Sequence, residues 1–346
     1  MKMTMSEVVV VLAASIALVA SGPASGQAPS TGSEPALSSS KGHAYPTKPV
    51  RLIIGGLPGT APDVIARIIG PSMSESMGQV LILDNRGGGA GLLGAQITAA
   101  AAPDGYTFLI VSGGSLVIVP FLTKTPPYDP VADFTPVTLV SLAPLVLASH
   151  PALPVKSVQE LVALSKAKPK DLLYGTPGVG SIHHLTVELL NSSAGIHLMH
   201  VPYKGGPPAV IDAMAGRVQL VITTVIPLSP HLKSARLRGL AVTSAQRTSV
   251  FPDLPTVAES GVPGFESHQW FGIFTPKNTP AAVRERFYKE VRMATDKPGA
   301  TAILDQEGQV LAVNGPKALD EFRRTETAKW TKIISQLHSA GAIELR

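Results

Sequence analysis

The sequence predicts an α/β fold in two lobes, each built on a mostly parallel sheet flanked by helices. Residues 50–112 alternate strand and helix patterns in the order βαβαβ, which implies a parallel sheet with helices on both faces. A second series of the same kind runs over 172–244. The 346 residues, of which 45% are hydrophobic and 15% charged, are enough for two domains with sizeable cores.

The first series has clear local boundaries. Apolar residues recur at helical spacing over 63–77, and Gly78 is a suitable residue to end that helix. Pro103, Asp104 and Gly105 stop the next helix. We therefore predict strands at 50–56, 80–84 and 106–112, helices at 63–77 and 91–102, and a long extended stretch at 136–149.

The second series begins after a capping box in which Ser157 and Glu160 open a helix that runs to about Ala167. Further strands are predicted at 172–175, 196–202, 218–225, 237–244, 270–275 and 309–313, and helices at 181–193, 207–215, 227–235, 279–296 and 316–339. The tail holds helices but little sheet, so we expect it to pack on the first lobe. The predicted lobes are then 45–143 with 269–346, and 144–268.

The N-terminus has the pattern of a signal peptide over 1–28. Lys2 precedes the apolar run Val8 to Ala20, and small residues follow it. The run is shorter than the roughly 20 residues of a membrane-spanning helix. A retained anchor is the alternative, and we favour cleavage near 26–28. Residues 29–44 are rich in Ser, Gly and Pro and are predicted to be a flexible linker.

Composition and motifs argue against several classes of protein. The net charge is +5 and the Lys and Arg residues form no stripe, so nucleic-acid binding is not expected. The absence of Cys excludes disulfides and thiolate chemistry. No G-x-S-x-G or Walker motif is present. His183 and His184 point about 100° apart on a helix, and His197 and His200 lie on a strand, so no metal site is expected.

Two strand-to-helix turns are candidate anion sites, one at 57–63 and one at 176–184. Free backbone N–H groups and the helix dipole favour an anion at such a turn. Each turn alone is explained by helix capping, since Thr60 and Asp63 match a capping box. The pair, with one turn in each lobe, could hold a diacid at both ends or one carboxylate from two sides.

Residues 89–94 match G-x-G-x-x-G, a dinucleotide-binding pattern. However, 84–88 intervene between the strand and the motif, and the acidic residue nearest the expected spacing, Asp104, falls in a turn. We interpret the motif as a tight glycine-rich loop. A dinucleotide-dependent α/β oxidoreductase is the alternative from another class.

A series of motifs resembles, in order, the solute receptors of tripartite tricarboxylate transporters, often called Bug proteins. The resemblance covers 45–346, and its motifs lie at 45–51, 84–91, 102–107, 127–130, 200–205, 240–244, 254–259 and 270–272. It implies a periplasmic binding protein of type II-like architecture, without catalysis, whose lobes close by a hinge on a small carboxylate. It also implies membrane transporter subunits as partners. A sensory receptor for the same ligand is a further alternative.

The resemblance further implies that the loops at 58–63 and 176–184 hold the ligand carboxylates through backbone groups and ordered water. The family's first loop is usually Pro followed by several Gly, then Thr and Asp, whereas this loop also contains Ala61 and Pro62, and Pro62 removes an N–H donor. Thr223 and Thr224 stand where the family usually has Asp and Asn. A di- or tricarboxylate, an aromatic acid and an acidic amino acid therefore all stay open.

We expect a monomer that needs no cofactor. In the first lobe, ligand contacts are expected from Gly59, Thr60 and Ala61, with Asp63 orienting their loop. The contacts expected in the second lobe come from Gly178, Gly180, Ser181 and His184. Further candidates for the cleft wall are Ser115, Tyr203, Thr224 and Trp270.

Overall fold

The computed structural model describes residues 45–88, 91–306, 308–341 and 343–344. The predicted signal peptide and linker at 1–44 lie outside the described residues. The described residues belong to one compact unit. In that described part, no helix is both long enough and apolar enough to cross a membrane.

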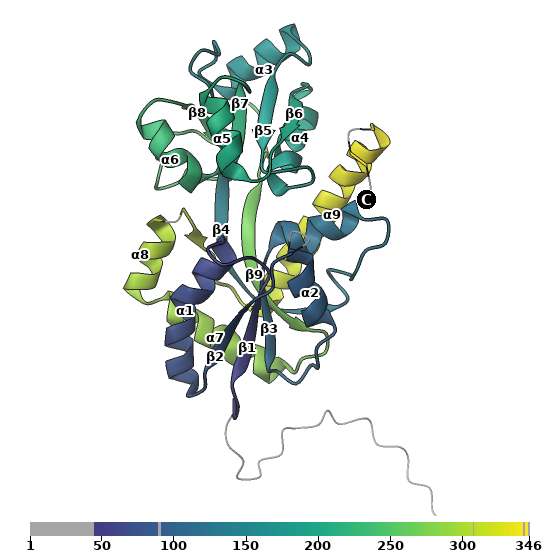
Figure 1. The fold of residues 1–346 in the computed structure, drawn as a ribbon, viewed down its shortest axis with the longest axis vertical. Coiled ribbons are helices and arrows are strands. Elements are labelled where there is room, and N and C mark those ends of the chain that lie inside the picture. The colour runs from purple at the N-terminus through teal and green to yellow at the C-terminus, as the bar shows by residue number, and fades with distance from the viewer. Residues whose placement is uncertain (1–44, 89–90, 307, 342, 345–346) are drawn as a thin grey trace, which may run out of the picture. The chain divides into compact units, whose positions relative to one another are not determined.

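The described chain is an α/β fold with two lobes, as predicted (Figure 1). The first lobe contains β1 (Val50–Ile54), β2 (Leu81–Asn85), β3 (Thr107–Ser112), β10 (Val310–Leu311), α1 (Ala61–Met77), α2 (Leu92–Ala99), α7 (Ala281–Thr295), α8 (Pro298–Gln306) and α9 (Pro316–Ser339). The second contains α3 (Val158–Ala167), β5 (Leu173–Thr176), α4 (Ile182–Ala194), β6 (Met199–Pro202), α5 (Gly206–Met214), β7 (Leu220–Thr224), α6 (Val225–Lys233) and β8 (Arg238–Val242).

Two long strands, β4 (Phe134–Ser149) and β9 (His268–Pro276), join the lobes (Figure 1). The strand order is β2-β1-β3-β9-β4-β7-β5-β6, and β8 and β10 also pair with β4. β1 is parallel to β2 and β3, and β5 is parallel to β6 and β7. β4 pairs with β9 as far as Pro144, opposite His268, and with β7 from Leu145 onward. β4 therefore belongs to both lobes.

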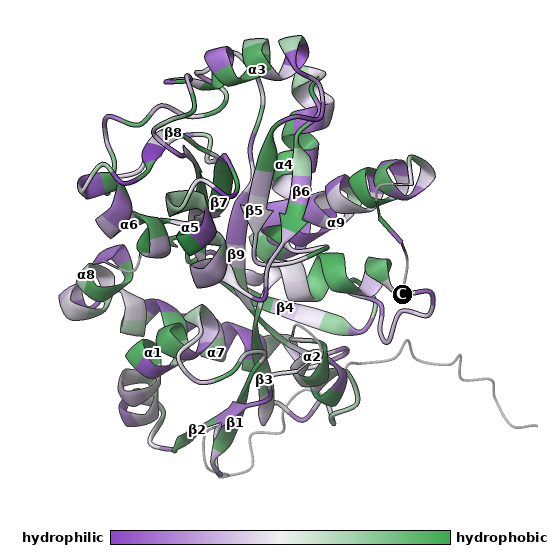
Figure 2. Cartoon of the chain, turned by 45° about the horizontal axis from the view of Figure 1, so that its top comes forward, coloured by the Kyte–Doolittle hydropathy of each residue, from purple (hydrophilic) through white to green (hydrophobic). Residues whose placement is uncertain are grey.

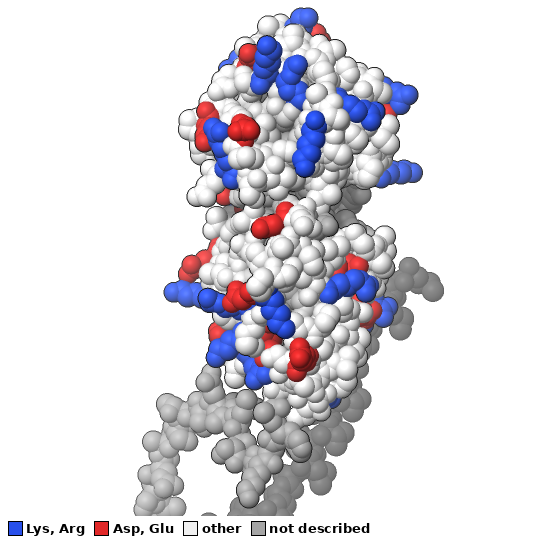
Figure 3. Space-filling view, turned by 90° about the vertical axis from the view of Figure 1, so that its left-hand side faces the viewer, with Lys and Arg blue, Asp and Glu red and all other residues white. Residues whose placement is uncertain are grey.

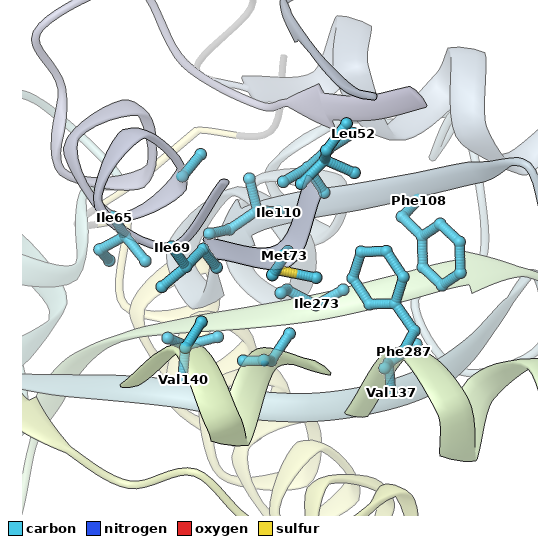
Figure 4. Close-up of a cluster of buried hydrophobic side chains, with 14 of the residues drawn as sticks. Leu52, Ile65, Ile69, Met73, Phe108, Ile110, Val137, Val140, Ile273 and Phe287 are labelled. Carbon is cyan, nitrogen blue, oxygen red and sulfur yellow. The ribbon is translucent and has the colours of Figure 1, made fainter. Parts of the chain in front are cut away.

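The core of the first lobe follows the two-residue alternation of its strands. Leu52 and Ile54 face α1 and α7, whereas Ile53 faces the side of α2 and α9. Phe108 of β3 stacks on Phe287 of α7 with ring centroids 3.6 Å apart (Figure 4). Both faces of this sheet are covered, which explains the apolar runs Leu52–Ile54 of β1 and Phe108–Val111 of β3.

α1 shows how the sequence pattern becomes a packed helix. Ile65, Ile69 and Met73 are fully buried against the sheet (Figure 4). The ribbon of α1 carries both hydrophobic and hydrophilic residues, which fits a helix with one face on the core (Figure 2). Gly78 ends the helix in the left-handed conformation with φ 65°.

Most predicted elements are found within a few residues of their expected limits. The capping box of α3 is confirmed in part: Ser157 Oγ accepts from Glu160 N at 3.1 Å, but Glu160 Oε2 accepts from Lys156 N. α8 was not predicted, because Lys297, Pro298 and Gly299 together have the pattern of a turn. The π-helical turn Gly114–Ile118 was also missed.

Candidate ligand-binding site

A cavity of about 480 Å³ lies between the lobes. Its wall on the first lobe is formed by Gly59, Thr60, Ala61, Val64, Ile65, Leu304 and Gln309. Its wall on the second lobe is formed by Pro177, His183, Gly206, Pro207, Thr223, Thr224, Ile226 and Pro227. Gln269 and Phe271 of β9, a strand that joins the lobes, complete it. The volume is suitable for a small organic molecule.

The cavity has no charged wall. None of its lining residues, all of which belong to the described part of the chain, is Asp, Glu, Lys or Arg. Burial lowers the pKa of the lining His183 to about 4, so its imidazole is neutral at neutral pH. Elsewhere on the surface, the described Lys and Arg side chains are scattered among Asp and Glu on the face drawn in Figure 3. Recognition in the cavity must therefore use backbone groups and neutral side chains.

Helix N-termini meet at this cavity. The first turns of α1, α5 and α6 contribute Ala61, Gly206 and Ile226 to its wall. The first N–H groups of a helix have no partner within the helix, and the helix dipole makes this end positive. Each of the three helices also carries Pro in its first turn, which removes an N–H donor. The cavity wall thus offers a small number of free backbone donors at the positive ends of these helices.

Asp63 holds the loop in front of α1. Its carboxylate accepts from Gly59 N at 2.8 Å, from Arg67 Nε at 2.9 Å and from Asn85 Nδ2 at 3.0 Å. Burial alone would raise the pKa of Asp63, but these hydrogen bonds outweigh it and hold the pKa below its usual value. The predicted capping box is wrong in both halves, because Thr60 Oγ1 donates to Leu57 O rather than capping the helix, and the Asp63 carboxylate accepts from Gly59 N rather than from Thr60 N.

The second predicted turn contributes less to the cavity than expected. Ser181 Oγ accepts from His184 N and donates to Gly178 O, so capping of α4 occupies it. A Cβ at Gly180 would lie 2.2 Å from Leu122 Cδ1, away from the cavity. Of this turn, the structure brings Pro177 and His183 to the cavity instead.

The expected orientation of the two histidines is wrong. His184 is buried, accepts from Gly180 N through Nδ1 and stacks on His200 with ring centroids 3.9 Å apart. Because neighbouring residues on a helix point about 100° apart, this places His183 on the cavity side. The sequence did not reveal which of His183 and His184 faces the cavity. The structure decides it through the contacts of His184 with Gly180 and His200.

Of the four further candidates for the cleft wall, one lines the cavity and three do not. Thr224 lines the cavity, where it is the N-cap of α6 without a side-chain cap hydrogen bond. Ser115 is buried and pairs with Ser112 Oγ at 2.8 Å, and Tyr203 donates to Asp212 at 2.9 Å. Trp270 is 1% exposed and packs against Phe274 and Phe322. The structure does not place these last three in the cavity wall.

Sequence reasoning missed the residues on either side of Trp270. Gln269 and Phe271 face the cavity while Trp270 faces the core, as the alternation of a strand requires. It also missed Gly206 and Ile226, although each lies just after a parallel strand, at the sheet edge where ligands bind. The rule that ligands bind at the carboxyl ends of parallel strands could have predicted both residues.

The glycine-rich motif at 89–94 lies partly outside the described residues. In the described part, Gly91 has φ 95° and precedes α2. A Cβ at Gly94 would lie 3.1 Å from Gly55 Cα, so Gly94 allows α2 to approach β1 closely. This packing supplies a structural reason for the glycine. No group of three potential metal-binding side chains occurs among the described residues.

Comparison with known protein families identifies the family of this chain. The model of the tripartite tricarboxylate transporter family receptor matches residues 65–338. The chain belongs to this family. Its members are periplasmic, solute-binding receptors.

Curated relatives of this receptor agree with the assignment. It is 39% identical over 292 residues to the UPF0065 protein in the tcbD-tcbE intergenic region of Pseudomonas sp. strain P51, covering 84% of this chain and 87% of that one. It is 32% identical over 293 residues to the protein BugT of Bordetella pertussis, covering 84% and 90%.

Solved structures resemble the receptor over most of its length. A protein of R. palustris solved with adipate has a TM-score of 0.73 and 34% identity, covering 87% of this chain and all of that one. MatC of Rhodopseudomonas palustris, solved with bound malate, has a TM-score of 0.70 and 27% identity, covering 84% and 100%. The periplasmic binding protein BugD has a TM-score of 0.70 and 29% identity, covering 87% and 100%.

Proposed function

We propose that this receptor binds one small carboxylate in the cavity between its lobes and presents it to the membrane subunits of a tripartite tricarboxylate-type transporter. The convergence of the first turns of α1, α5 and α6 on a cavity with no charged lining residue carries this proposal. A carboxylate is one of the anions to which such backbone N–H groups donate hydrogen bonds. The adipate and malate bound to two similar proteins support the same class.

The lining favours an acid with an apolar body. Val64, Ile65, Phe271 and Leu304 form one side of the cavity, and Ile226 lies on the opposite lobe. Ile65, Phe271 and Leu304 are already buried, so a body of alkyl or aromatic carbon would remove mainly the half-buried Val64 and the 41% exposed Ile226 from water. The few N–H donors suit one or two carboxylate groups better than three. We therefore place monocarboxylates and dicarboxylates ahead of tricarboxylates and acidic amino acids.

Contacts are proposed for the cavity residues of the two lobes. The loop Gly59, Thr60 and Ala61 would hold a carboxylate from the first lobe, with Asp63 keeping the loop in place. The hydroxyl of Thr224, in the second lobe, would donate a hydrogen bond to the carboxylate. Gly178, Gly180, Ser181 and His184 would act by shaping the α4 end of the cavity.

Melting and calorimetry of the mature chain test the ligand class. A ligand that binds only the folded state raises the free energy of unfolding by about 2.7 kcal/mol at a hundredfold excess over Kd. We expect a shift in Tm with some carboxylates and none with NAD or NADP. Thr224→Val removes one hydroxyl at nearly constant volume and should weaken binding about tenfold. Thr325→Val, an exposed threonine on α9, is the matched control. A Tm shift with NAD or NADP alone would overturn the proposal.

Export and delivery are separate parts of the proposal. The pattern at 1–28 supports cleavage and export to the periplasm, which mass spectrometry of the chain purified from periplasmic extract would test. A start of the mature chain between 26 and 30 is the expected result, and an intact N-terminus would contradict it. Ligand-dependent uptake lost on deletion of the receptor would support transport, whereas a transcriptional response without uptake would favour the sensory alternative.

A further inference from the structure

The two lobes touch each other at two places beside the cavity. On the α6 side, a Cβ at Gly308, which lies two residues before β10 in the first lobe, would lie 2.9 Å from Val225 Cβ. On the α4 side, a Cβ at Gly114, in the π-helical turn of the first lobe, would lie 4.0 Å from Ile182 Cβ. The chain neighbours of Gly308, Val225 and Ile182 line the cavity, so both contacts lie at its wall. Figures 1 and 2 show α6 and α8 on one side of β4 and β9, and α4 and α9 on the other.

Val225 and Ile182 hold equivalent positions in their helices. Each is the first residue, of α6 and of α4 respectively, and the two side chains are 2% and 4% exposed. Each also faces a glycine of the first lobe. A difference between the two sides therefore comes from what surrounds these contacts.

The α4 side is an apolar core that the lobes share. Ile182 and Leu185 of α4 belong to the same buried cluster as Leu116 and Val117 of the π-helical turn. Leu185, Leu116 and Val117 are completely buried. Separation of the lobes on this side would bring these side chains into contact with water, which is unfavourable.

The α6 side has no such shared core. Val225 packs in a cluster of second-lobe residues, whereas Leu304 of α8 packs in a separate cluster of the first lobe. Ile226 and Ile303, the chain neighbours of this pair, are 41% and 45% exposed. Among the described residues, no hydrogen bond or ion pair joins α6 to α8 or β10. Separation on this side therefore breaks little beyond the contact of Val225 with Gly308.

We propose that the cavity opens on the α6 side, by separation of Val225 from Gly308, while the α4 side stays packed. Strands β4 and β9, which join the lobes, would bend to allow this movement. The absence of a side chain at Gly308 lets the first lobe close against Val225. Ile226 and Ile303 would flank the entrance. The inference goes beyond the proposed function, because it names the path into the cavity and holds for whichever molecule binds there.

Chemical labelling of single cysteines tests where the cavity opens. The chain contains no Cys, so Val225→Cys and Ile182→Cys each introduce the only thiol. The rate at which each folded variant reacts with a maleimide is measured and divided by the rate of the same variant unfolded in urea. We expect this normalised rate to be at least tenfold higher for Val225→Cys than for Ile182→Cys. Both substitutions keep a small apolar side chain, and melting verifies that each variant folds.

Leu228→Cys separates opening of the lobes from local unfolding of α6. Leu228 is completely buried in the same helix and the same cluster as Val225. If the lobes separate while α6 stays folded, Leu228→Cys should react as slowly as Ile182→Cys.

Gly308 supplies a second test of the same contact. Gly308→Ala places a Cβ against Val225 and should hold the α6 side open, so the labelling rate of Val225→Cys should rise threefold or more. Gly78→Ala is the matched control, because its φ of 65° is as strained for Ala as the φ of 64° at Gly308, but a Cβ there meets nothing within 4 Å. It should leave the labelling rate unchanged.

A disulfide tests whether the α4 side stays packed. Gly114→Cys with Ile182→Cys places two Cβ atoms 4.0 Å apart, within the roughly 3.5–4.5 Å of natural disulfides. Once this pair is oxidised, the thiol of Val225→Cys in the same chain should react within threefold of its rate in the single variant.

Three results would overturn the proposal. The first is a normalised rate for Val225→Cys no more than threefold above that for Ile182→Cys. The second is equally fast labelling of Leu228→Cys, which would show unfolding of α6. The third is loss of Val225→Cys labelling when the disulfide on the α4 side forms. All of these measurements are made without ligand, so failure of the entrance is distinct from failure of carboxylate binding.

Discussion

The carboxylate of Asp63 accepts a hydrogen bond from the backbone N–H of Gly59 at 2.8 Å. This bond ties the loop at the cavity to the first turn of α1, four residues along the chain. Arg67 and Asn85 donate to the same carboxylate. A buried acidic side chain thus sets the position of a loop whose own cavity residues are uncharged.

Replacement of Asp63 by Asn is expected to loosen this loop. The charge that receives three hydrogen bonds is removed, and hydrogen bonds to a charged group are worth about 1.5–3 kcal/mol. We expect the free energy of unfolding to fall by about 2 kcal/mol and the ligand affinity to fall with it. Urea denaturation at neutral pH measures the first effect. Asp253→Asn, at an exposed position, is the control, and equal loss in both variants would contradict the role of Asp63.

Replacement of Gly113 by Ala is expected to disturb Trp270. A Cβ at Gly113 would lie 2.0 Å from Trp270 Cε2, so the indole or the backbone must move. Overpacking of this kind costs roughly 1–3 kcal/mol. Chemical denaturation should show that loss, with a change in tryptophan fluorescence. Gly299→Ala in α8, where a Cβ meets nothing within 4 Å, should be neutral or slightly stabilising. A Gly113→Ala protein as stable as the parent would refute the close contact.

A negative charge at Ile226 is expected to repel the ligand. This side chain is 41% exposed at the cavity wall, so Ile226→Glu should fold normally. A carboxylate beside a bound carboxylate should weaken binding at least about tenfold, or roughly 1.4 kcal/mol, and less so at high salt. Ile211→Glu places the same charge at a 57% exposed position of α5 outside the cavity wall. Undiminished affinity for carboxylates in Ile226→Glu would argue against an anionic ligand in this cavity.

Lowering the pH from 6.5 towards 4 is expected to destabilise the folded receptor, at pH values higher than those at which most carboxylates become protonated. Burial lowers the pKa of His184 to about 3 and the pKa of His200 to about 4. The unfolded chain binds protons near the ordinary pKa of 6.5, before the folded chain does. The stability is therefore fully present above pH 6.5 and is lost as the pH falls towards 4.

The size of this effect can be measured directly. Each buried histidine contributes at most roughly 1.4 kcal/mol per pH unit within the window from pH 6.5 to 4. Urea denaturation at pH 7, 6 and 5 should show a falling free energy of unfolding, and His200→Gln should flatten the slope. A free energy that stays constant from pH 7 to pH 5 would show that these imidazoles are not buried in neutral form.

Local patterns were enough to predict which segments are strands and which are helices. The two-residue period of a strand and the 3.6-residue period of a helix are properties of neighbouring residues. The predicted limits of α1 and β3 therefore lie within two residues of the observed ones. Positions with competing local signals were less certain. α8 was missed because Pro298 and Gly299 at its start are also typical of turns.

The sequence by itself determined the α/β alternation and, through its ordered motifs, the receptor family. It also predicted that the loop of Gly59 and Thr60 lines the cavity, because a turn between a strand and a helix is recognisable locally. Only the tertiary structure decided which face of each element meets the cavity. Gln269 rather than Trp270, and His183 rather than His184, line it. Periodicity establishes that neighbours face apart, but the packing of the lobes determines which of them faces the ligand.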